Sequence, residues 1–126
     1  VVRIYGNNYK TKDGTCIRDF IHVSDLADIH VKCINYLYKK KKSIILNCGY
    51  GIGYSVQEIV NIFKKIKKNC KVVYEKKRVG DVDQVYSNIK KFKKTFKWKP
   101  KHNNIKKILL SSIKWERKLS KNNVKK

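Results

Sequence analysis

The 126-residue sequence lacks methionine altogether and has one proline, one alanine and only 9 acidic residues. Because translation normally starts with methionine, we expect that Val1 is not the natural start and that the chain is a piece of a longer protein. The sequence also lacks any run of about 18 apolar residues, which excludes a membrane-spanning helix. Hydrophobic residues still make up 41% of the chain, and with the 6 glycines they favour a globular domain over disorder.

The scarcity of acidic residues leaves 32 lysines and arginines nearly unopposed, at a formal net charge of +23. Such a charge suggests a nucleic-acid or anionic-membrane partner. However, all but four of the basic residues are lysine, whereas arginine is the usual choice for bidentate contacts to phosphates and base edges. Lys, Asn, Ile, Tyr and Phe, which have A/T-rich codons, fill more than half of the positions. We therefore interpret the excess of lysine as the result of an A/T-rich genome acting on solvated positions. Coding DNA that is not A/T-rich would contradict this interpretation. We expect neither nucleic acid nor membrane as a partner.

The chain has few cysteines and histidines, and none of them cluster in the sequence. Cys16, Cys33, Cys48 and Cys70 show no C-x₂₋₄-C spacing, which argues against a zinc site. A secreted disulfide framework is the weaker alternative, and reduced thiols in a cytoplasmic protein are the expectation. We expect no metal.

The pattern of apolar residues predicts an α/β chain without an internal linker. Strands or extended segments are expected over 1–5, 16–23, 43–48 and 70–74. Helices are expected over 24–38, 55–68, 88–96 and 104–119, with loops over 6–14, 49–54 and 75–83. The polar tail 120–126 is expected to fray.

Two of these helices carry specific local signals. In the helix 24–38, the spacing of Leu26, His30, Cys33 and Leu37 predicts one apolar face, and His30 is interpreted as a core histidine rather than a ligand. The helix 55–68 begins with S-V-Q-E. The Ser55 side chain can accept from the third amide of the helix while the glutamate reaches back to the amide of Ser55, which is a capping box.

A glycine-rich stretch, N-C-G-Y-G-I-G-Y-S over 47–55, follows an expected strand and opens a helix, as a dinucleotide-binding loop does. Glu75 also lies near the end of the next expected strand, as the ribose-binding acid of such folds does. The pattern is nevertheless G-x-G-x-G, with Tyr54 at the place of the third glycine. A tight turn whose amides are free for an anion, or a plain strand-to-helix corner, is at least as good an interpretation.

Two further patterns have ordinary explanations. The motif Y-x-x-x-K, a catalytic pair in short-chain dehydrogenases, occurs at Tyr36/Lys40, Tyr38/Lys42 and Tyr86/Lys90, as chance predicts in a chain so rich in both residues. The stretch 86–101 interleaves Phe92, Phe96 and Trp98 with lysines. These rings could stack on single-stranded bases, but their spacing favours an amphipathic helix with its aromatics in the core.

Two segments centred on arginines are the most informative. Arg18 and Phe20 alternate on an extended segment, and Arg78 and Asp81 flank a glycine in a loop. Two converging guanidinium groups would suit a diphosphate, because each can donate two hydrogen bonds, and a neighbouring carboxylate could accept from a ribose. Surface ion pairs, either Arg18–Asp19 or Arg78–Asp81, explain these residues equally well.

A resemblance decides between these alternatives. The segments D-G-T-C-I-R-D-F-I-H-V-S-D-L-A-D-I-H (13–30), N-C-G-Y-G-I-G-Y-S-V-Q-E (47–58) and R-V-G-D (78–81) occur in this order and spacing. Together they resemble the C-terminal part of UDP-glucose 4-epimerases, which are extended short-chain dehydrogenases/reductases. Trp98 and Pro100 resemble the W-x-P that precedes the last helix of that family. The resemblance runs from Val2 to about Leu119.

This resemblance implies the roles of several residues. Matched by position, Arg18 and Arg78 correspond to diphosphate-binding arginines, and Asp81 to a carboxylate on the uridine ribose. Tyr5 corresponds to an aromatic residue whose backbone meets the uracil, and Val56 to a residue that lines the nucleotide.

Two more matched positions bear on the sugar. Phe20 stands where the family usually has tyrosine, so one polar contact is expected to be lost. Val85 occupies a position whose size helps decide whether an N-acetyl group fits, and its small side chain leads us to expect that UDP-N-acetylhexosamines are also accepted. Another UDP-sugar epimerase or dehydratase, and a basic nucleic-acid-binding module, are the alternatives.

The same resemblance implies a cytoplasmic, homodimeric isomerase of galactose metabolism. It would interconvert UDP-glucose and UDP-galactose through a 4-keto intermediate, with NAD taking and returning the hydride. NAD and the catalytic Tyr-x-x-x-Lys pair are expected on a Rossmann domain encoded before Val1. We therefore expect no catalytic and no cofactor-binding residue in this chain, and no activity from it alone.

The expected division of the chain follows. Residues 1–48 would pack partly on the Rossmann domain, with the last helix and strand of that sheet at 24–38 and 43–48. Residues 49–119 would form the substrate domain, and 120–126 the tail. Without the Rossmann domain, apolar surface would be exposed, so the isolated chain is expected to be poorly soluble or molten.

Overall fold

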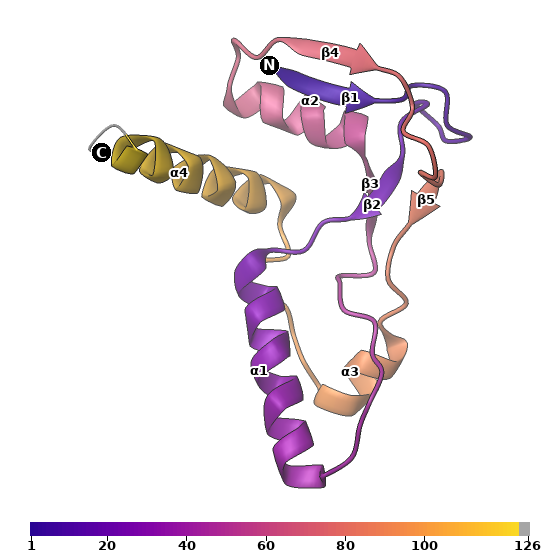
Figure 1. Ribbon diagram of the computed structural model, residues 1–126, viewed down its shortest axis with the longest axis vertical. Coiled ribbons are helices and arrows are strands. Elements are labelled where there is room, and N and C mark those ends of the chain that lie inside the picture. Colours follow the sequence, from indigo (N-terminus) through magenta and orange to yellow (C-terminus); the bar gives the residue numbers. More distant parts are fainter. Residues whose placement is uncertain (124–126) are drawn as a thin grey trace.

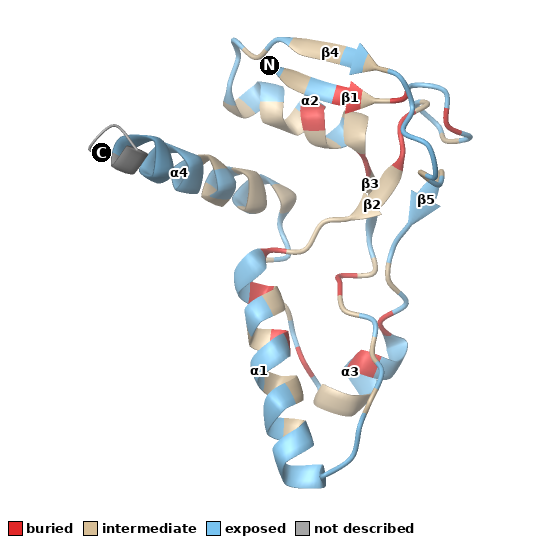
Figure 2. Cartoon of the chain, viewed as in Figure 1, coloured by how far each residue is buried: buried red, intermediate tan, exposed pale blue. Residues whose placement is uncertain are grey.

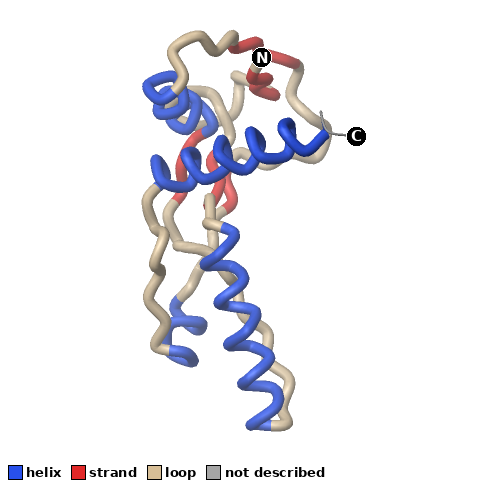
Figure 3. Tube along the Cα trace, turned by 90° about the vertical axis from the view of Figure 1, so that its left-hand side faces the viewer, coloured by secondary structure: helices blue, strands red, loops and turns tan. Residues whose placement is uncertain are grey.

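The computed structural model describes residues 1–123, which form a bent molecule with a sheet-containing part and a helical part (Figures 1 and 3). The strands are β1 Val2–Tyr5, β2 Ile17–Asp19, β3 Gly53–Ser55, β4 Val72–Glu75 and β5 Gln84–Val85. The helices are α1 Val23–Lys40, α2 Val56–Ile66, α3 Lys90–Phe96 and α4 Ile105–Asn123. The predicted α/β class is confirmed. The sequence did not predict β3 and β5, because two or three residues are too few to show a strand period.

Two small sheets meet beside one loop. β1 and β4 pair in parallel, with Tyr5 opposite Glu75, and α2 packs on this pair (Figure 1). β2 is the middle strand of the other sheet, antiparallel to β3 and parallel to β5. Because the chain passes from β4 directly to β5, the loop 76–83 lies between the ends of β1 and β2.

The main buried cluster lies in the helical part, between α1, α3 and the segments beside them (Figure 2). It consists of Ile29, Tyr50, Phe92 and Trp98, and Phe92 is fully inaccessible. The indole Nε1 of Trp98 donates to Asp28 at 2.8 Å. Phe92, Phe96 and Trp98 thus point into the core, as the amphipathic interpretation predicts. The base-stacking alternative is wrong for Phe92 and Trp98, because buried rings cannot meet bases.

The strand predicted over 43–48 stays a prediction, because its expected partner is the Rossmann sheet rather than a strand of this chain. Among the described residues, no strand pairs with this segment. Its side chains do alternate: Leu46 and Cys48 pack against the core cluster, whereas Ile45 is 85% exposed. The segment is therefore extended with one face covered, but a strand also needs a hydrogen-bonded neighbour.

The helix predicted over 24–38 exists as α1, but the face that it buries is not centred on the predicted apolar residues. It begins after His22, whose Nδ1 accepts from the Ser24 amide at 3.1 Å. Asp25 and Ile29 are the buried residues of α1, whereas His30 is exposed and contacts only the Leu26 carbonyl within its own helix. The interpretation of His30 as a core residue is therefore wrong.

A second apolar face of α1 points to solvent. Ala27, Val31, Ile34 and Tyr38 follow each other at helical spacing, and all four are exposed. The exposed fractions of Val31, Ile34 and Tyr38 are 55%, 64% and 77%. We call these four residues the outer stripe of α1. A solvated helix face of this kind is normally polar.

The other helices begin largely as predicted. Ser55 and Glu58 form both hydrogen bonds of the capping box at α2, and α4 packs against α2. α4 continues to Asn123, so the expected fraying over 120–123 is wrong, while 124–126 lie outside the described residues.

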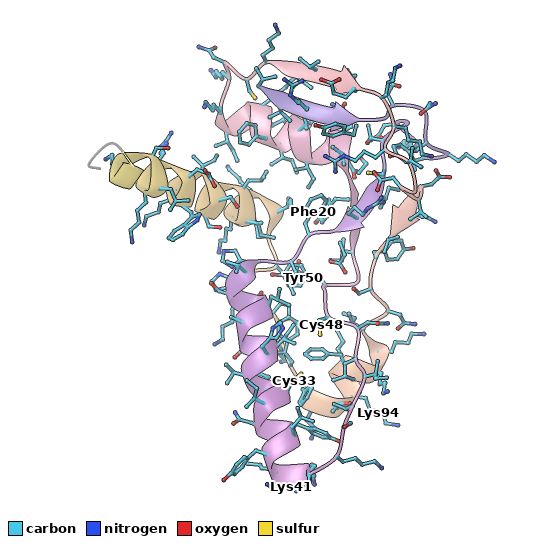
Figure 4. All side chains as sticks on the ribbon, in the orientation of Figure 1. Phe20, Cys33, Lys41, Cys48, Tyr50 and Lys94 are labelled. Carbon is cyan, nitrogen blue, oxygen red and sulfur yellow. The ribbon has the colours of Figure 1, made fainter. Side chains whose placement is uncertain are left out.

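All four cysteines are free thiols, and only Cys16 is fully buried. Cys33 of α1 and Cys48 of the extended segment lie on facing sides of the helical part (Figure 4). Burial, with the neighbouring Cys33 thiol, raises the pKa of Cys48. Across residues 1–123, no helix has the length and apolarity to cross a bilayer, and no cluster of three or more His, Cys, Asp or Glu side chains could bind a metal ion.

Candidate functional site

Arg18 links the middle strand β2 to the loop 76–83. Its guanidinium donates to the carbonyl oxygens of Ile17 at 2.8 Å and Val82 at 3.0 Å. One nitrogen also lies 3.7 Å from Asp81 Oδ1. The side chains of Arg18 and Asp81 are 27% and 35% exposed, so this ion pair is partly shielded from water but open to a ligand.

Arg78 belongs to this loop and contacts the end of β1. Its guanidinium carbon lies 3.8 Å from the centre of the Tyr5 ring at the end of β1, a cation–π contact. Gly80, at φ 84°, lets the loop turn so that the Asp81 amide donates to the Arg78 carbonyl at 3.3 Å. No carboxylate in the described part of the chain pairs with Arg78. Its donors therefore remain available to an anion.

The remaining predicted residues lie on segments that pair with β2 or adjoin it. Val85 on β5 is paired in register with Arg18 and is 54% exposed. Val56 begins α2 and donates its amide to the carbonyl of Cys16, next to β2. Phe20 is half-buried on the segment that follows β2, which ends at Asp19 (Figure 4). The structure thus places Tyr5 in contact with Arg78. It pairs Arg18 with Asp81 through their charges and with Val85 in the sheet.

Neither of the surface ion pairs considered from the sequence is formed. Neighbouring residues on a strand point to opposite faces, so Asp19 turns away from Arg18. Its carboxylate accepts from the amides of Tyr50 at 3.0 Å, Gly51 at 2.9 Å and Ser87 at 3.2 Å. Asp19 therefore ties β2 to the glycine-rich turn and to the segment after β5. Alternation along the strand was the signal that could have revealed this role.

These hydrogen bonds decide against a dinucleotide site in the glycine-rich stretch. The turn amides are already donated to Asp19, and a Cβ on Gly49 would collide with that carboxylate. The first amides of α2 are also occupied within the fold, since those of Gln57 and Glu58 each donate at 3.0 Å to hydroxyl oxygens. A pyrophosphate needs such amides free. The residues present therefore do not fit NAD, and the interpretation as a turn with amides free for an anion is also wrong.

Tyr9 is a residue of the site that the sequence analysis missed. It lies in the loop 6–14, is only 4% exposed, and its hydroxyl donates to Asp81 Oδ2 at 3.2 Å. Lys77 lies over its ring at 4.0 Å and also pairs with Asp83 at 3.4 Å. A large aromatic side chain in an otherwise polar, glycine-rich loop was the available signal, because such a ring is rarely left in solvent.

A second buried carboxylate organises the helical part. Asp25 accepts from the Tyr50 hydroxyl at 2.7 Å and from the amides of Lys101 and His102 at 3.2 and 2.9 Å. Burial opposes its ionisation, but these hydrogen bonds hold the pKa of Asp25 below its usual value. Burial and the bond to Asp25 raise the pKa of Tyr50 to about 12. Both groups are thus held in one protonation state and serve the fold.

A groove lies away from the arginines, between two helices. It occupies about 1020 Å³ between α2 and α4 and is lined by residues that include Ile66, Leu110 and Trp115. None of the predicted site residues lines this groove. The arginines and Asp81 instead lie on an open surface.

Comparison with known proteins agrees with the motifs. The model of the NAD dependent epimerase/dehydratase family matches residues 2–49. A UDP-glucose 4-epimerase of Azospirillum brasilense is 40% identical over 92% of this chain and 34% of its own length. The crystal structure of a UDP-glucose-4-epimerase from Stenotrophomonas maltophila, with bound NAD and formylated UDP-arabinopyranose, superposes with a TM-score of 0.87 at 31% identity, over 96% of this chain and 36% of that one. The UDP-Glc/GlcNAc 4-epimerase of Campylobacter jejuni superposes with a TM-score of 0.78 at 39% identity, over 93% of this chain and 36% of that one.

The chain spans about a third of the length of the relatives that it matches. Within that third, the order of strands and helices is that of extended short-chain dehydrogenase/reductase epimerases. The chain is therefore related to the NAD dependent epimerase/dehydratase family, and its predicted resemblance to UDP-glucose 4-epimerases is confirmed.

Proposed function

We propose that this chain is the UDP-sugar-binding portion of a UDP-sugar 4-epimerase, with UDP-glucose and UDP-galactose as the interconverted pair. The observation that carries the proposal is that Arg18 of β2 pairs at 3.7 Å with Asp81, in the same loop that holds Arg78. These residues come from segments 60 residues apart in the chain, which chance pairing on a lysine-rich surface does not explain. The relatives named above support the reaction type.

In this proposal, the residues of the chain bind and orient the nucleotide. Arg18 and Arg78 neutralise the diphosphate, and each can donate two parallel hydrogen bonds. Asp81 accepts from the ribose, while the backbone of Tyr5 and the side chain of Val56 border the base and nucleoside. Holding the nucleotide at one end restricts the sugar to a few orientations, which lowers the entropic cost of reaction. Hydride chemistry is left to residues outside this chain, because the glycine-rich turn does not fit NAD.

The outer stripe of α1 supports the proposed division of the chain. Its exposed apolar residues and the unpaired extended segment 43–48 lie on neighbouring elements of the helical part. We propose that residues 1–48 pack partly on a Rossmann domain, with the segment 43–48 completing its sheet and residues 49–119 forming the substrate domain. A homodimer, a cytoplasmic location and inactivity of the isolated chain stay predictions.

Binding of UDP at two salt concentrations tests the function. We expect UDP to bind with an affinity that falls only a few-fold between 50 and 200 mM salt, because two or three side chains contact it. Binding of single-stranded DNA through many lysines would instead fall by about a thousandfold or more over that range. Isothermal titration calorimetry measures both. Absence of UDP binding together with steep, salt-dependent DNA binding would contradict the epimerase proposal in favour of the nucleic-acid alternative.

The size of Val85 leads to a prediction about the sugar. Its side chain is small and exposed on β5, beside Arg18. We expect the protein expressed from its complete gene to epimerise UDP-N-acetylglucosamine as well as UDP-glucose, and Val85→Tyr to lower kcat/KM for the N-acetylated substrate at least tenfold more than for UDP-glucose. Steady-state kinetics with both substrates measures this ratio. Equal losses for both sugars, or no turnover of the N-acetylated substrate by the unmodified protein, would refute it.

A further inference from the structure

Tyr9 is held rigidly although it belongs to a loop. Its amide donates to the Gly14 carbonyl at 2.9 Å, and its carbonyl accepts from the Thr11 amide at 2.8 Å. The ring lies so close to Gly6 that a Cβ there would collide with it. Lys77 lies over the ring at 4.0 Å. Ring and backbone are therefore both fixed before any ligand arrives.

The carboxylate that Tyr9 contacts follows an exposed stretch of the loop 76–83. Residues 76–80 are all exposed, and Val79 has no protection from solvent at all. Asp81 is attached to the rest of the fold by the Tyr9 hydroxyl on Oδ2 and by the looser approach of Arg18 to Oδ1 at 3.7 Å. A carboxylate on such a loop would otherwise occupy several rotamers.

The hydroxyl acts as a donor throughout the neutral range. Burial, and then the hydrogen bond to Asp81, raise the pKa of Tyr9 above its ordinary value. The ring therefore keeps its proton, and Asp81 accepts on Oδ2. Because a carboxylate oxygen bonded to one donor keeps further lone pairs, and Oδ1 has no partner closer than 3.7 Å, Asp81 retains acceptor capacity for a ligand.

We propose that Tyr9 is a positioning residue of the nucleotide site, which locks the Asp81 carboxylate on Oδ2 so that its free acceptor positions face the ribose hydroxyls. The inference rests on the proposed function and adds to it the residue that preorganises the ribose contact. An ordered acceptor avoids the entropic cost of immobilising a side chain on binding. Tyr9 itself need not touch the ligand.

The test compares UDP with 2′-deoxy-UDP in the protein expressed from its complete gene. Tyr9→Phe removes only the hydroxyl. We expect this variant to bind UDP about three- to tenfold more weakly, to bind 2′-deoxy-UDP less than twofold more weakly, and so to lose most of its discrimination between the two. Isothermal titration calorimetry gives all four dissociation constants. In an Asp81→Ala background, Tyr9→Phe should cause no further loss, because the two residues act as one unit.

A matched control is Tyr74→Phe, which also removes a tyrosine hydroxyl. The Tyr74 hydroxyl donates to the Gln57 side chain at 2.6 Å on an exposed surface. It should leave both affinities unchanged. If Tyr9→Phe weakens UDP and 2′-deoxy-UDP equally, or adds to the loss in the Asp81→Ala background, Tyr9 is merely structural and the inference is overturned. If Arg18→Gln and Arg78→Gln also leave UDP binding intact, the proposed function fails as well. Loss of UDP binding in the arginine variants with unchanged discrimination in Tyr9→Phe would refute only the role of Tyr9.

Discussion

Replacing Arg18 by glutamine is expected to weaken UDP binding by about ten- to a hundredfold, since hydrogen bonds to charged groups contribute about 1.5–3 kcal/mol. Glutamine keeps a polar amide at this partly exposed position, so the substitution buries no unpaired charge. What disappears is the positive charge, and with it the planar fork that matches a phosphate. The loss should therefore appear in ligand affinity rather than in the thermal unfolding temperature.

Two companion variants sharpen this result. Arg18→Lys keeps the charge but not the fork, and should recover only part of the affinity. Arg117→Gln removes the same charge from α4, where Arg117 lines the groove against α2 rather than the nucleotide site. Calorimetric titration with UDP should show less than a twofold change for Arg117→Gln. Equal losses at positions 18 and 117 would show that overall charge, not the arginine site, attracts UDP.

Replacing Ile34 by lysine is expected to destabilise the protein expressed from its complete gene, by about 3–5 kcal/mol. This magnitude combines the loss of a buried isoleucine with the desolvation of an ammonium group at the proposed contact with the Rossmann domain. In the isolated 126-residue chain, Ile34 is 64% exposed, so the same substitution should leave stability unchanged and improve solubility. The two contexts thus predict opposite outcomes for one substitution.

Chemical denaturation of the longer protein and light scattering of the isolated chain measure the two effects. Ile34→Val is the matched control, because it keeps an apolar side chain and should cost no more than about 1 kcal/mol in either context. A longer protein that tolerates Ile34→Lys without loss of stability would show that the outer stripe of α1 is not a domain contact. The proposed division of the chain would then be wrong.

The sequence allowed correct predictions where the residues that interact lie within a few positions of each other in the chain. The capping box at Ser55 shows this, since the side chain and the amides that it satisfies are three residues apart. The inward aromatics of α3 show it too, because helical spacing alone places Phe92 and Phe96 on one side. The motif around Arg18 and the loop at Arg78 likewise identified the two segments that the fold brings together.

Errors and open predictions arose where the decisive partner is distant in sequence. The segment 43–48 has the alternation of a strand, but no strand among the described residues pairs with it. The amides of the glycine-rich turn looked free because Asp19, their acceptor, lies about 30 residues away. His30 was assigned to the core because α1 is apolar on two sides, and only packing shows which side is covered.

The sequence by itself determined the α/β pattern, the family resemblance and the identity of the residues that could hold a UDP-sugar. It could do so because periodicity, capping and motifs are properties of contiguous residues. Only the tertiary structure decided how these residues act. It showed that Asp19 accepts the amide hydrogen bonds of the glycine-rich turn that a dinucleotide would need. It also showed that Arg18 rather than Arg78 pairs with Asp81, and that the Tyr9 hydroxyl donates to the same carboxylate. The reason is physical: a carboxylate accepts from whichever donors the fold brings near, and the donors to Asp19 and Asp81 lie 31 to 72 residues away along the chain.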